Sequence, residues 1–554
     1  MLIRHQIARL LREAGESAQV AGDLPAVAID DAYVERTNNA ARGDYASSLP
    51  MRLARAAGMP PAAIAEKVLR RVLPHSAIER IEIAPPGFMN VTLSRDWLRS
   101  QVDAIVDADD NFGRIELGNG SRVQIEFVSA NPTGYLTAAS GRAGALGDAL
   151  GNVLAFAGYQ IEREYYVNDA GSQVAAFYGS VWARYREVFG LNGTIPDNGY
   201  HGPAIREIAG AIAEQHGRAF VEMDEATAIE KVGRLGLDAV LIAIKEDLAR
   251  FGVTFDRWYS EESLHQTRAI DAAVAHLRQR GFLAEREGAI WFTSTDIGDE
   301  RDHVLVRSNG VPTYMAADIA YHHDKFIVRG FDRVIDIWGA DHHGHVQGMV
   351  ASVEALGVDR SRFTVLLHQM VTIKRGTEIV RMSKRAGDYV ALRDVLDEVG
   401  SDACRYFFLA RTANAHVDFD LELAKRESDD NPVYYVQYGH ARTASILRRA
   451  EGIDPRSGDT RHLSDDAEFT LIRKLLQFPE IVEVAATMLE PHHLPHYARE
   501  LAATFSQFYE TCRVLGDDPD VTSARLKLVL ATKVTLRNCL RLMGMSAPER
   551  MDRG

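Results

Sequence analysis

The residues best suited to chemistry lie in a short polar segment that follows an apolar run. Residues 339–345 read Gly-Ala-Asp-His-His-Gly-His, and the apolar stretch 333–338 before them is typical of a buried strand. Open parallel sheets bind ligands at the carboxyl ends of their strands. One aspartate and three histidines could bind zinc, because both side chains are zinc ligands. A polar loop without a metal is the simpler alternative, and both stay open at this point.

A second candidate site is a turn between a predicted strand and a predicted helix. Residues 122–128 favour a strand, residues 129–134 contain the proline and glycine of a turn, and residues 138–157 favour a long helix. The start of a helix after such a turn binds phosphate, because its amide groups and dipole favour anions. Glycines recur along this helix, at Gly141, Gly144, Gly147 and Gly151. Since glycine costs helix stability, they predict close packing or a ligand beside the helix.

A third candidate is the basic segment 381–385, which reads Arg-Met-Ser-Lys-Arg and lies between Gly376 and Gly387. Short basic clusters are most often solvated surface. The functional alternative is a loop whose lysine neutralises charge on nucleotide phosphates as a bond breaks.

These candidates need a surrounding α/β framework, and the rest of the chain predicts one. Residues 1–110 favour a small α/β domain, with a helix opening at Pro61 and a hairpin over 81–93. A second set of strands and loops is expected after residue 300, with strands at 304–307, 333–338 and 363–367. From about residue 390 onward the apolar periodicity is helical, over 395–410, 431–450, 465–489 and 497–543.

Composition narrows the class of protein. The chain has 554 residues, a net charge of −14 and a pI near 5.8, which disfavours nonspecific coating of nucleic acid but permits a local basic face. No apolar run approaches the ~20 residues of a membrane span, so no membrane association is expected. The three cysteines form no Cys-x-x-Cys pair, which fits a reducing cytoplasm.

Several longer motifs, in order and at characteristic spacing, resemble the arginyl-tRNA synthetase family of class I aminoacyl-tRNA synthetases. Residues 126–136 resemble the stretch that leads into the family's His-x-Gly-His signature, 381–385 its Lys-Met-Ser-Lys loop, and 339–345 its adenosine-packing Gly-x-Asp-x-x-x-His element. Further segments resemble the family's terminal and catalytic domains: 43–45, 86–90, 164–171, 199–202, 431–438 and 548–551. The resemblance therefore extends from end to end.

The resemblance implies a fold with a class I Rossmann-type catalytic domain, an N-terminal α/β domain and a C-terminal all-helical anticodon-binding domain. The expected domains are an N-terminal tRNA-contacting domain, the catalytic domain with an insertion about 172–295, a connecting stem and the helical domain, at 1–112, 113–390, 391–430 and 431–554. It also implies a cytoplasmic monomer that uses ATP, Mg²⁺, L-arginine and tRNA(Arg).

Residue roles follow from the same resemblance. The expected catalytic residues are Lys384, Ser383, Thr137 and Ser140. ATP is expected at Gly134, Thr137, Ser140, Gly339, Asp341, His342, Met382 and Lys384. Arginine is expected at Glu126, Ser129, Asn131, Tyr314, Asp318 and His342, with Tyr314 and Asp318 one helical turn apart and facing the guanidinium. A planar cation with five donors needs such a carboxylate. No residue is expected to bind a metal.

The chain departs from the family where the signature histidines belong. Thr137 and Ser140 replace the two histidines, and Ala139 replaces the glycine. A hydroxyl donates a hydrogen bond without a positive charge, so each replacement loses about 1–2 kcal/mol and slows the reaction roughly five- to thirtyfold. Lys384, Arg385, Arg142 or the helix end could compensate.

The predicted function is therefore ATP-dependent attachment of L-arginine to tRNA(Arg) through arginyl-adenylate. Three alternatives stay open. One is a paralogue that transfers activated arginine elsewhere, and another is a catalytically silent tRNA(Arg)-binding protein. The third is a zinc hydrolase built on residues 341–345.

Overall fold

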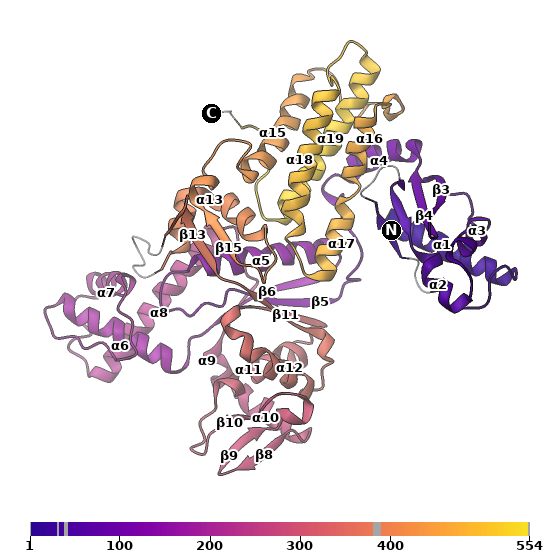
Figure 1. The fold of residues 1–554 in the computed structure, drawn as a ribbon. Helices are drawn as coiled ribbons and strands as arrows, with labels where there is room; N and C mark the ends of the chain where they lie inside the picture. The colour runs from indigo at the N-terminus through magenta and orange to yellow at the C-terminus, as the bar shows by residue number, and fades with distance from the viewer. Residues whose placement is uncertain (1, 30–32, 38–41, 381–388, 552–554) are drawn as a thin grey trace.

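The computed structural model describes residues 2–29, 33–37, 42–380 and 389–551 (Figure 1). At its centre lies a five-stranded parallel sheet in the order β12 (Phe363–His368), β11 (Arg333–Gly339), β5 (Arg122–Glu126), β6 (Gln160–Val167) and β7 (Arg257–Ser260). The chain builds outward from β5 to β7 and then returns to β11 on the other side of β5. The sheet order therefore reverses between β5 and β11, where open α/β sheets bind ligands.

The glycine-rich helix α5 (Ala138–Phe156) follows β5 and is buried on nearly every side. A Cβ at Gly147 would lie 2.2 Å from the ring of Phe127, and one at Gly141 would lie 2.6 Å from Leu392. At Gly151 it would lie 2.8 Å from the guanidinium of Arg163. Close packing, one of the two causes expected from the sequence, therefore accounts for these three glycines.

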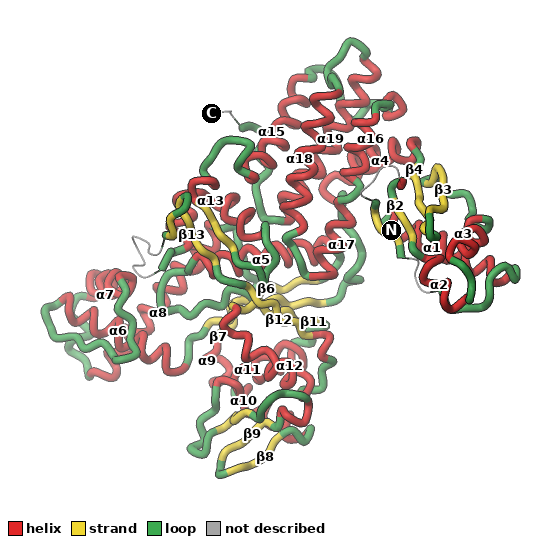
Figure 2. Tube along the Cα trace, viewed as in Figure 1, coloured by secondary structure: helices red, strands yellow, loops and turns green. Residues whose placement is uncertain are grey.

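Two further units extend from the central sheet, as Figure 2 shows. One is helical, with α6 (Gly171–Val188), α7 (Pro203–His216) and α8 (Glu225–Arg250). The other packs α9 (Glu261–Gln266), α10 (Ala269–Gln279), α11 (Tyr314–His323) and α12 (Val346–Ala355) near a small antiparallel sheet of β8 (Leu283–Arg286), β9 (Ala289–Phe292) and β10 (His303–Val306). The strand expected at 304–307 is therefore present but belongs to this small sheet, and not to the sheet of β11 and β12.

The N-terminal region forms a separate α/β unit (Figure 1). Its four-stranded antiparallel sheet has the order β1 (Val34–Arg36), β2 (Tyr45–Ser47), β4 (Phe88–Leu93), β3 (Ile78–Ala84), which includes the predicted hairpin. Its helices are α1 (Ile3–Val20), α2 (Leu49–Ala57) and α3 (Pro61–Leu69), whereas α4 (Arg95–Ala108), which follows β4, packs against α16 (Asp466–Leu475) and α19 (Pro519–Leu542) of the C-terminal part.

The C-terminal part is helical, as predicted, but two of the expected helices are divided. Residues 465–489 form α16 (Asp466–Leu475) and α17 (Phe478–Met488), and residues 497–543 form α18 (His493–Thr511) and α19 (Pro519–Leu542). Both second helices carry proline in their first turn, where its missing N–H costs nothing. The other elements are α13 (Leu392–Leu409), α14 (Leu421–Ala424), α15 (Pro432–Arg449) and the sheet of β13 (Val371–Arg375), β14 (Glu378–Ile379) and β15 (Val417–Asp420).

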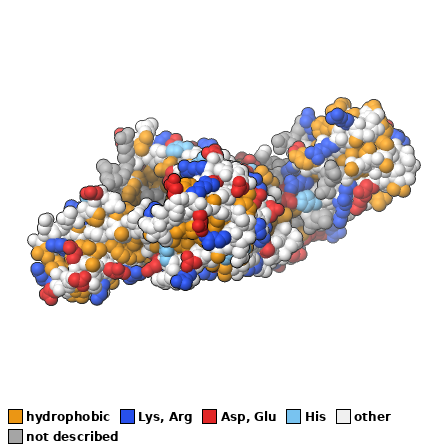
Figure 3. All heavy atoms as spheres, turned by 90° about the horizontal axis from the view of Figure 1, so that it is seen from below, with side chains coloured by type: hydrophobic (Ala, Val, Ile, Leu, Met, Phe, Trp, Pro, Cys, Tyr) orange, Lys and Arg blue, Asp and Glu red, His pale blue; other side chains and the backbone are white. Residues whose placement is uncertain are grey.

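Seen from below, basic and acidic side chains are interspersed among hydrophobic ones over the visible face (Figure 3). None of the helices within the described ranges has the length and hydropathy that crossing a bilayer requires.

Candidate active site

A strained turn directly after β5 opens the site. Val128 and Ser129 have φ values of 68° and 38°, which L-residues, and β-branched ones above all, rarely adopt. Hydrogen bonds hold the turn: the Ser129 hydroxyl donates to Glu126 at 2.7 Å and accepts from the Tyr166 amide at 3.1 Å. Such strain persists only where neighbours over-determine it, as at ligand-binding sites. The turn therefore fixes Ser129 beside the Glu126 carboxylate at the end of β5.

Glu126 belongs to a buried group of charges. The ammonium of Lys325 lies 3.1 Å from Glu126 and 2.8 Å from Asp336, and the side chain of Lys325 is fully buried. Burial raises the pKa of Glu126, and the charge of Lys325 opposes that effect. Lys325 comes from the turn after α11 and Asp336 from β11, so three separate segments meet here.

The buried charges continue to the other end of the site through His322. Its Nε2 lies 2.9 Å from Asp336, and its Nδ1 lies 2.8 Å from the backbone carbonyl of Asp318. A continuous set of polar contacts therefore joins Glu126 to Asp318 through Lys325, Asp336 and His322. We call this set the buried relay.

Tyr314 and Asp318 lie one turn apart on α11, as the sequence predicted. Nε2 of His345 lies 2.9 Å from the Asp318 carboxylate. The centroid of the His345 ring lies 5.5 Å from that of the Tyr314 ring. The Tyr314 ring is 69% exposed, so it is available to a ligand. The three side chains form one polar surface beside the end of β11.

Sequence reasoning missed a further acid at this surface, Glu261 at the start of α9. Burial raises its pKa to about 7, and the negative charges of Asp318 and Asp169 add to the effect. Asp169 is held by the hydroxyl of Ser260 at 2.6 Å and by the amide of Glu262 at 2.8 Å. No strand was predicted at 257–260, which Glu261 follows, and the carboxyl groups around it come from distant segments, so no local motif marks it. The three carboxyl groups form an acidic cluster suited to a cation.

Two of the expected arginine-binding side chains make other contacts within the described structure. The Asn131 amide donates to Gln173 at 2.9 Å. His342 is exposed, 3.7 Å from Asp341, and its ring lies 6.2 Å from that of Trp338. The structure thus brings Glu126 and Ser129 together, and it separately brings Tyr314 and Asp318 together. Asn131 and His342 lie at the edge of this site.

The start of α5 carries the two hydroxyls that replace the signature histidines. Thr137 is the N-cap, and its hydroxyl accepts from the Ser140 amide at 3.1 Å. The two hydroxyl oxygens are also 3.1 Å apart, so they face the same way, as predicted. A Cβ at Gly134 would lie 3.0 Å from the Tyr389 hydroxyl, so the glycine turn packs closely on residue 389.

The basic segment 381–385, with Met382, Ser383 and Lys384, lies outside the described residues. Its downstream flank is well placed: the amide of Ala138 donates to Val390 at 3.1 Å, and the amide of Leu392 donates to Leu136 at 2.7 Å. The chain therefore leaves this segment directly alongside the start of α5.

The structure corrects one expectation and disfavours one of the alternatives. Arg142 is buried and donates to the carbonyls of Gln369 at 2.7 Å and Thr412 at 2.9 Å, so its charge holds the interior together and cannot stand in for a signature histidine. Burial lowers its pKa to about 10. The polar segment 341–345 does not converge on a metal: within the described ranges, the one group of three close ligand side chains lies elsewhere, in the C-terminal helices.

Family models match in order along the chain. They are described as the arginyl tRNA synthetase N terminal domain, at residues 1–93, tRNA synthetases class I (R), catalytic domain, at 101–413, and the DALR anticodon binding domain, at 436–551. The solved structure of a putative arginyl-tRNA synthetase from Campylobacter jejuni is 32% identical, with a TM-score of 0.77 over 83% of this chain and 100% of that one. The arginyl-tRNA synthetase of Thermus thermophilus shares the fold, with a TM-score of 0.77 at 22% identity over 98% of this chain and all of that one.

Curated relatives match over their full length. An arginine–tRNA ligase of Dehalococcoides mccartyi is 48% identical over 553 residues, which cover 100% of this chain and 99% of the relative. One from Moorella thermoacetica is 45% identical and covers 99% of each chain. Taken with the site at the sheet edge, these matches show that the chain belongs to the arginyl-tRNA synthetase family of class I aminoacyl-tRNA synthetases.

Proposed function

We propose that the protein is an arginine–tRNA ligase, which attaches L-arginine to tRNA(Arg) at the expense of ATP. The observation that carries the proposal is the acidic cluster of Asp318, Glu261 and Asp169, in which Asp318 lies one helical turn from Tyr314, at the sheet edge where this fold binds ligands. A guanidinium is a planar cation with five donors, and carboxylates with an aromatic face match it.

The other end of arginine is assigned to the strained turn. Glu126 takes the α-ammonium, with Ser129 beside it, while Asn131 and His342 serve the carboxylate side. Glu126 already accepts from Ser129 and Lys325, through different oxygens. A carboxylate has about four acceptor sites, so an ammonium can still bind.

ATP is assigned to the edge between α5 and β11. Gly134, Thr137 and Ser140 lie at the start of α5, where the helix end favours phosphate. Adenosine is assigned to the surface formed by Gly339, Asp341 and His342. Met382, Ser383 and Lys384 complete the site from the segment 381–385, where Lys384 balances charge on the phosphates. ATP enters as its Mg²⁺ complex, so the metal is carried by the substrate.

The reaction has two steps. A carboxylate oxygen of arginine attacks the α-phosphorus of ATP in line, the bond to the β-phosphate oxygen breaks, and pyrophosphate leaves. The terminal ribose hydroxyl of tRNA(Arg) then attacks the carbonyl carbon of arginyl-adenylate and loses its proton as AMP leaves. No covalent enzyme intermediate is needed, because positioning and charge stabilisation supply the catalysis.

The first test is arginylation of tRNA(Arg) by the purified protein and by a Lys384→Ala variant. Loss of a charged hydrogen bond of about 1.5–3 kcal/mol predicts charging slower by roughly ten- to a hundredfold. Arginine-dependent ATP–pyrophosphate exchange in the presence of tRNA is measured alongside.

The same assays separate the alternatives. Exchange without charging would indicate a paralogue that transfers arginine elsewhere. Binding of tRNA(Arg) with neither exchange nor charging would indicate a silent binder, and either result would overturn the proposal.

A further inference from the structure

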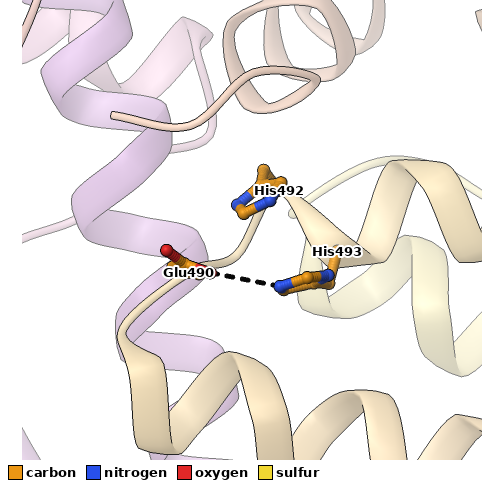
Figure 4. Close-up of side chains that lie close together, drawn as sticks. All are labelled: Glu490, His492 and His493. Atoms are coloured by element: carbon orange, nitrogen blue, oxygen red, sulfur yellow. Dashed lines mark hydrogen bonds and ion pairs between the residues drawn. The ribbon is translucent and has the colours of Figure 1, made fainter. Parts of the chain in front are cut away.

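A compact group of potential metal-binding side chains lies outside the active site described above, in the turn between α17 and α18. Glu490, His492 and His493 each place one ligand atom within 4.8 Å of the other two (Figure 4). All three residues are partly buried. In Figure 4 the Glu490 and His493 side chains point toward each other, with His492 above them. We propose that this Glu-x-His-His turn is a binding site for a zinc ion.

The chemistry of the group fits zinc. Two imidazoles and one carboxylate are zinc ligands, and three protein ligands with water in the fourth position make a common site. Ligand distances of about 2.0–2.2 Å place tetrahedral ligands roughly 3.4 Å apart. Glu490 Oε2 and His493 Nε2 are already 3.2 Å apart, so one edge of that tetrahedron is formed. Small side-chain rotations bring His492 to the third position.

The backbone holds the turn in this shape. Leu489, with a φ of 58°, ends α17 in a left-handed conformation. At the start of α18, the carbonyl of Leu494 accepts from Cys539 in α19, and that of Pro495 accepts from Tyr406 in α13. The ligands therefore sit on a platform fixed from two other helices, and little conformational entropy is lost when a metal binds.

Histidine binds zinc only through a nitrogen that carries no proton. Burial lowers the pKa of His492, and the neighbouring His493 lowers it further. The centroids of the two rings lie 4.2 Å apart, so one zinc ion can be shared by both imidazoles.

The test is zinc binding by the full-length protein, measured by calorimetry and by metal content after equilibrium dialysis. A His492→Gln/His493→Gln variant should bind one zinc fewer than wild type, and Glu490→Gln should bind at that site at least tenfold more weakly. His462→Gln, which removes an exposed histidine of the same domain, is the matched control and should bind as wild type does. Comparison by difference removes any zinc bound elsewhere on the protein.

A second readout tests the site without relying on stoichiometry. Zinc should raise the unfolding temperature of wild type and of His462→Gln but not of the double variant, because a ligand of the folded state stabilises it. Equal zinc content in wild type and double variant, with equal thermal shifts, would overturn the proposal.

Discussion

The pKa of the Glu261 carboxyl is set by the charges and the burial around it. Its pKa of about 7 reflects burial and the nearby carboxylates of Asp318 and Asp169. About half of the Glu261 side chains therefore carry a proton at neutral pH. A guanidinium bound beside Glu261 favours the ionised carboxylate, so arginine binding releases that proton.

We expect arginine binding near pH 7 to release a fraction of a proton, and binding near pH 9 to release none. Calorimetry in buffers with different ionisation enthalpies measures this release. Glu261→Gln should abolish it, whereas Glu262→Gln, at the neighbouring position, should retain it. Equal release by the two variants would contradict the assignment of Glu261 to the arginine pocket.

At the start of α5, structural and catalytic roles can be separated by substitution. Thr137→Ala removes an N-cap and should cost about 0.5–2 kcal/mol of stability, whereas Thr137→Ser should cost little. Ser140→Ala keeps the cap that its amide makes with Thr137. It should slow ATP–pyrophosphate exchange roughly two- to tenfold, the worth of one neutral hydrogen bond, without changing stability. Unchanged exchange would show that the Ser140 hydroxyl does not contact ATP.

Between elements, the buried relay ties β5, α11 and β11 together. Lys325→Met would leave Glu126 and Asp336 buried without their cation. Removing one partner of a buried pair costs about 3–5 kcal/mol, and we expect a loss of this size in urea unfolding. Because Glu126 would also shift, KM for arginine should rise more than KM for ATP. A variant with wild-type stability and unchanged KM values would contradict this role.

His368, at the end of β12, should make the free energy of unfolding depend on pH. Burial lowers the pKa of His368 to about 4, from about 6.5 when unfolded. Between these values the unfolded chain binds more protons, so stability is full above pH 6.5 and falls as the pH drops toward 4. The shift corresponds to about 3 kcal/mol. His368→Gln should flatten the pH dependence of unfolding in this window, and an unchanged profile would contradict it.

Elements whose own sequence carries a strong pattern were predicted well. Features that depend on pairing between distant segments were not. The strands at β5, β11 and β12 and the helix α5 follow from apolar runs and the turn at 129–134. The sheet to which β10 belongs depends on pairing with β9, which no local pattern encodes. The pair Tyr314–Asp318 was predicted from the family resemblance, and its spacing of four placed both residues on one helical face. Glu261 and the buried relay, in contrast, are assembled from distant segments.

In the whole molecule, the N-terminal unit is held to the C-terminal helices by ion pairs. Glu480 of α17 accepts from Arg36 at 3.0 Å and from Tyr45 at 2.5 Å, Asp44 pairs with Arg473 at 2.5 Å, and Arg4 pairs with Glu483. The side chain of Glu480 is nearly buried, at 10% exposure, so these contacts lie inside the interface and are weakly screened by solvent.

Glu480→Ala should loosen this interface, because it removes the carboxylate that accepts from both Arg36 and Tyr45. We expect faster limited proteolysis at the junction between β4 of the N-terminal unit and α4, near residues 93–95. Glu483→Ala should have a smaller effect, because it removes only the partner of Arg4 and His5 and leaves the contacts of Glu480 in place. Arginine-dependent exchange should be affected less than tRNA affinity. Unchanged cleavage in Glu480→Ala would contradict a clamping role.

The docking of the N-terminal unit also has a consequence for biosynthesis. Arg36 and Glu480 are 444 positions apart in the chain. At about 5–20 residues per second, a ribosome needs roughly 20–90 seconds to make the intervening chain. Throughout that interval the finished N-terminal unit has no partner surface to dock on. Its own core must therefore keep it folded during translation, and the unit can dock only after α16 and α17 have left the exit tunnel.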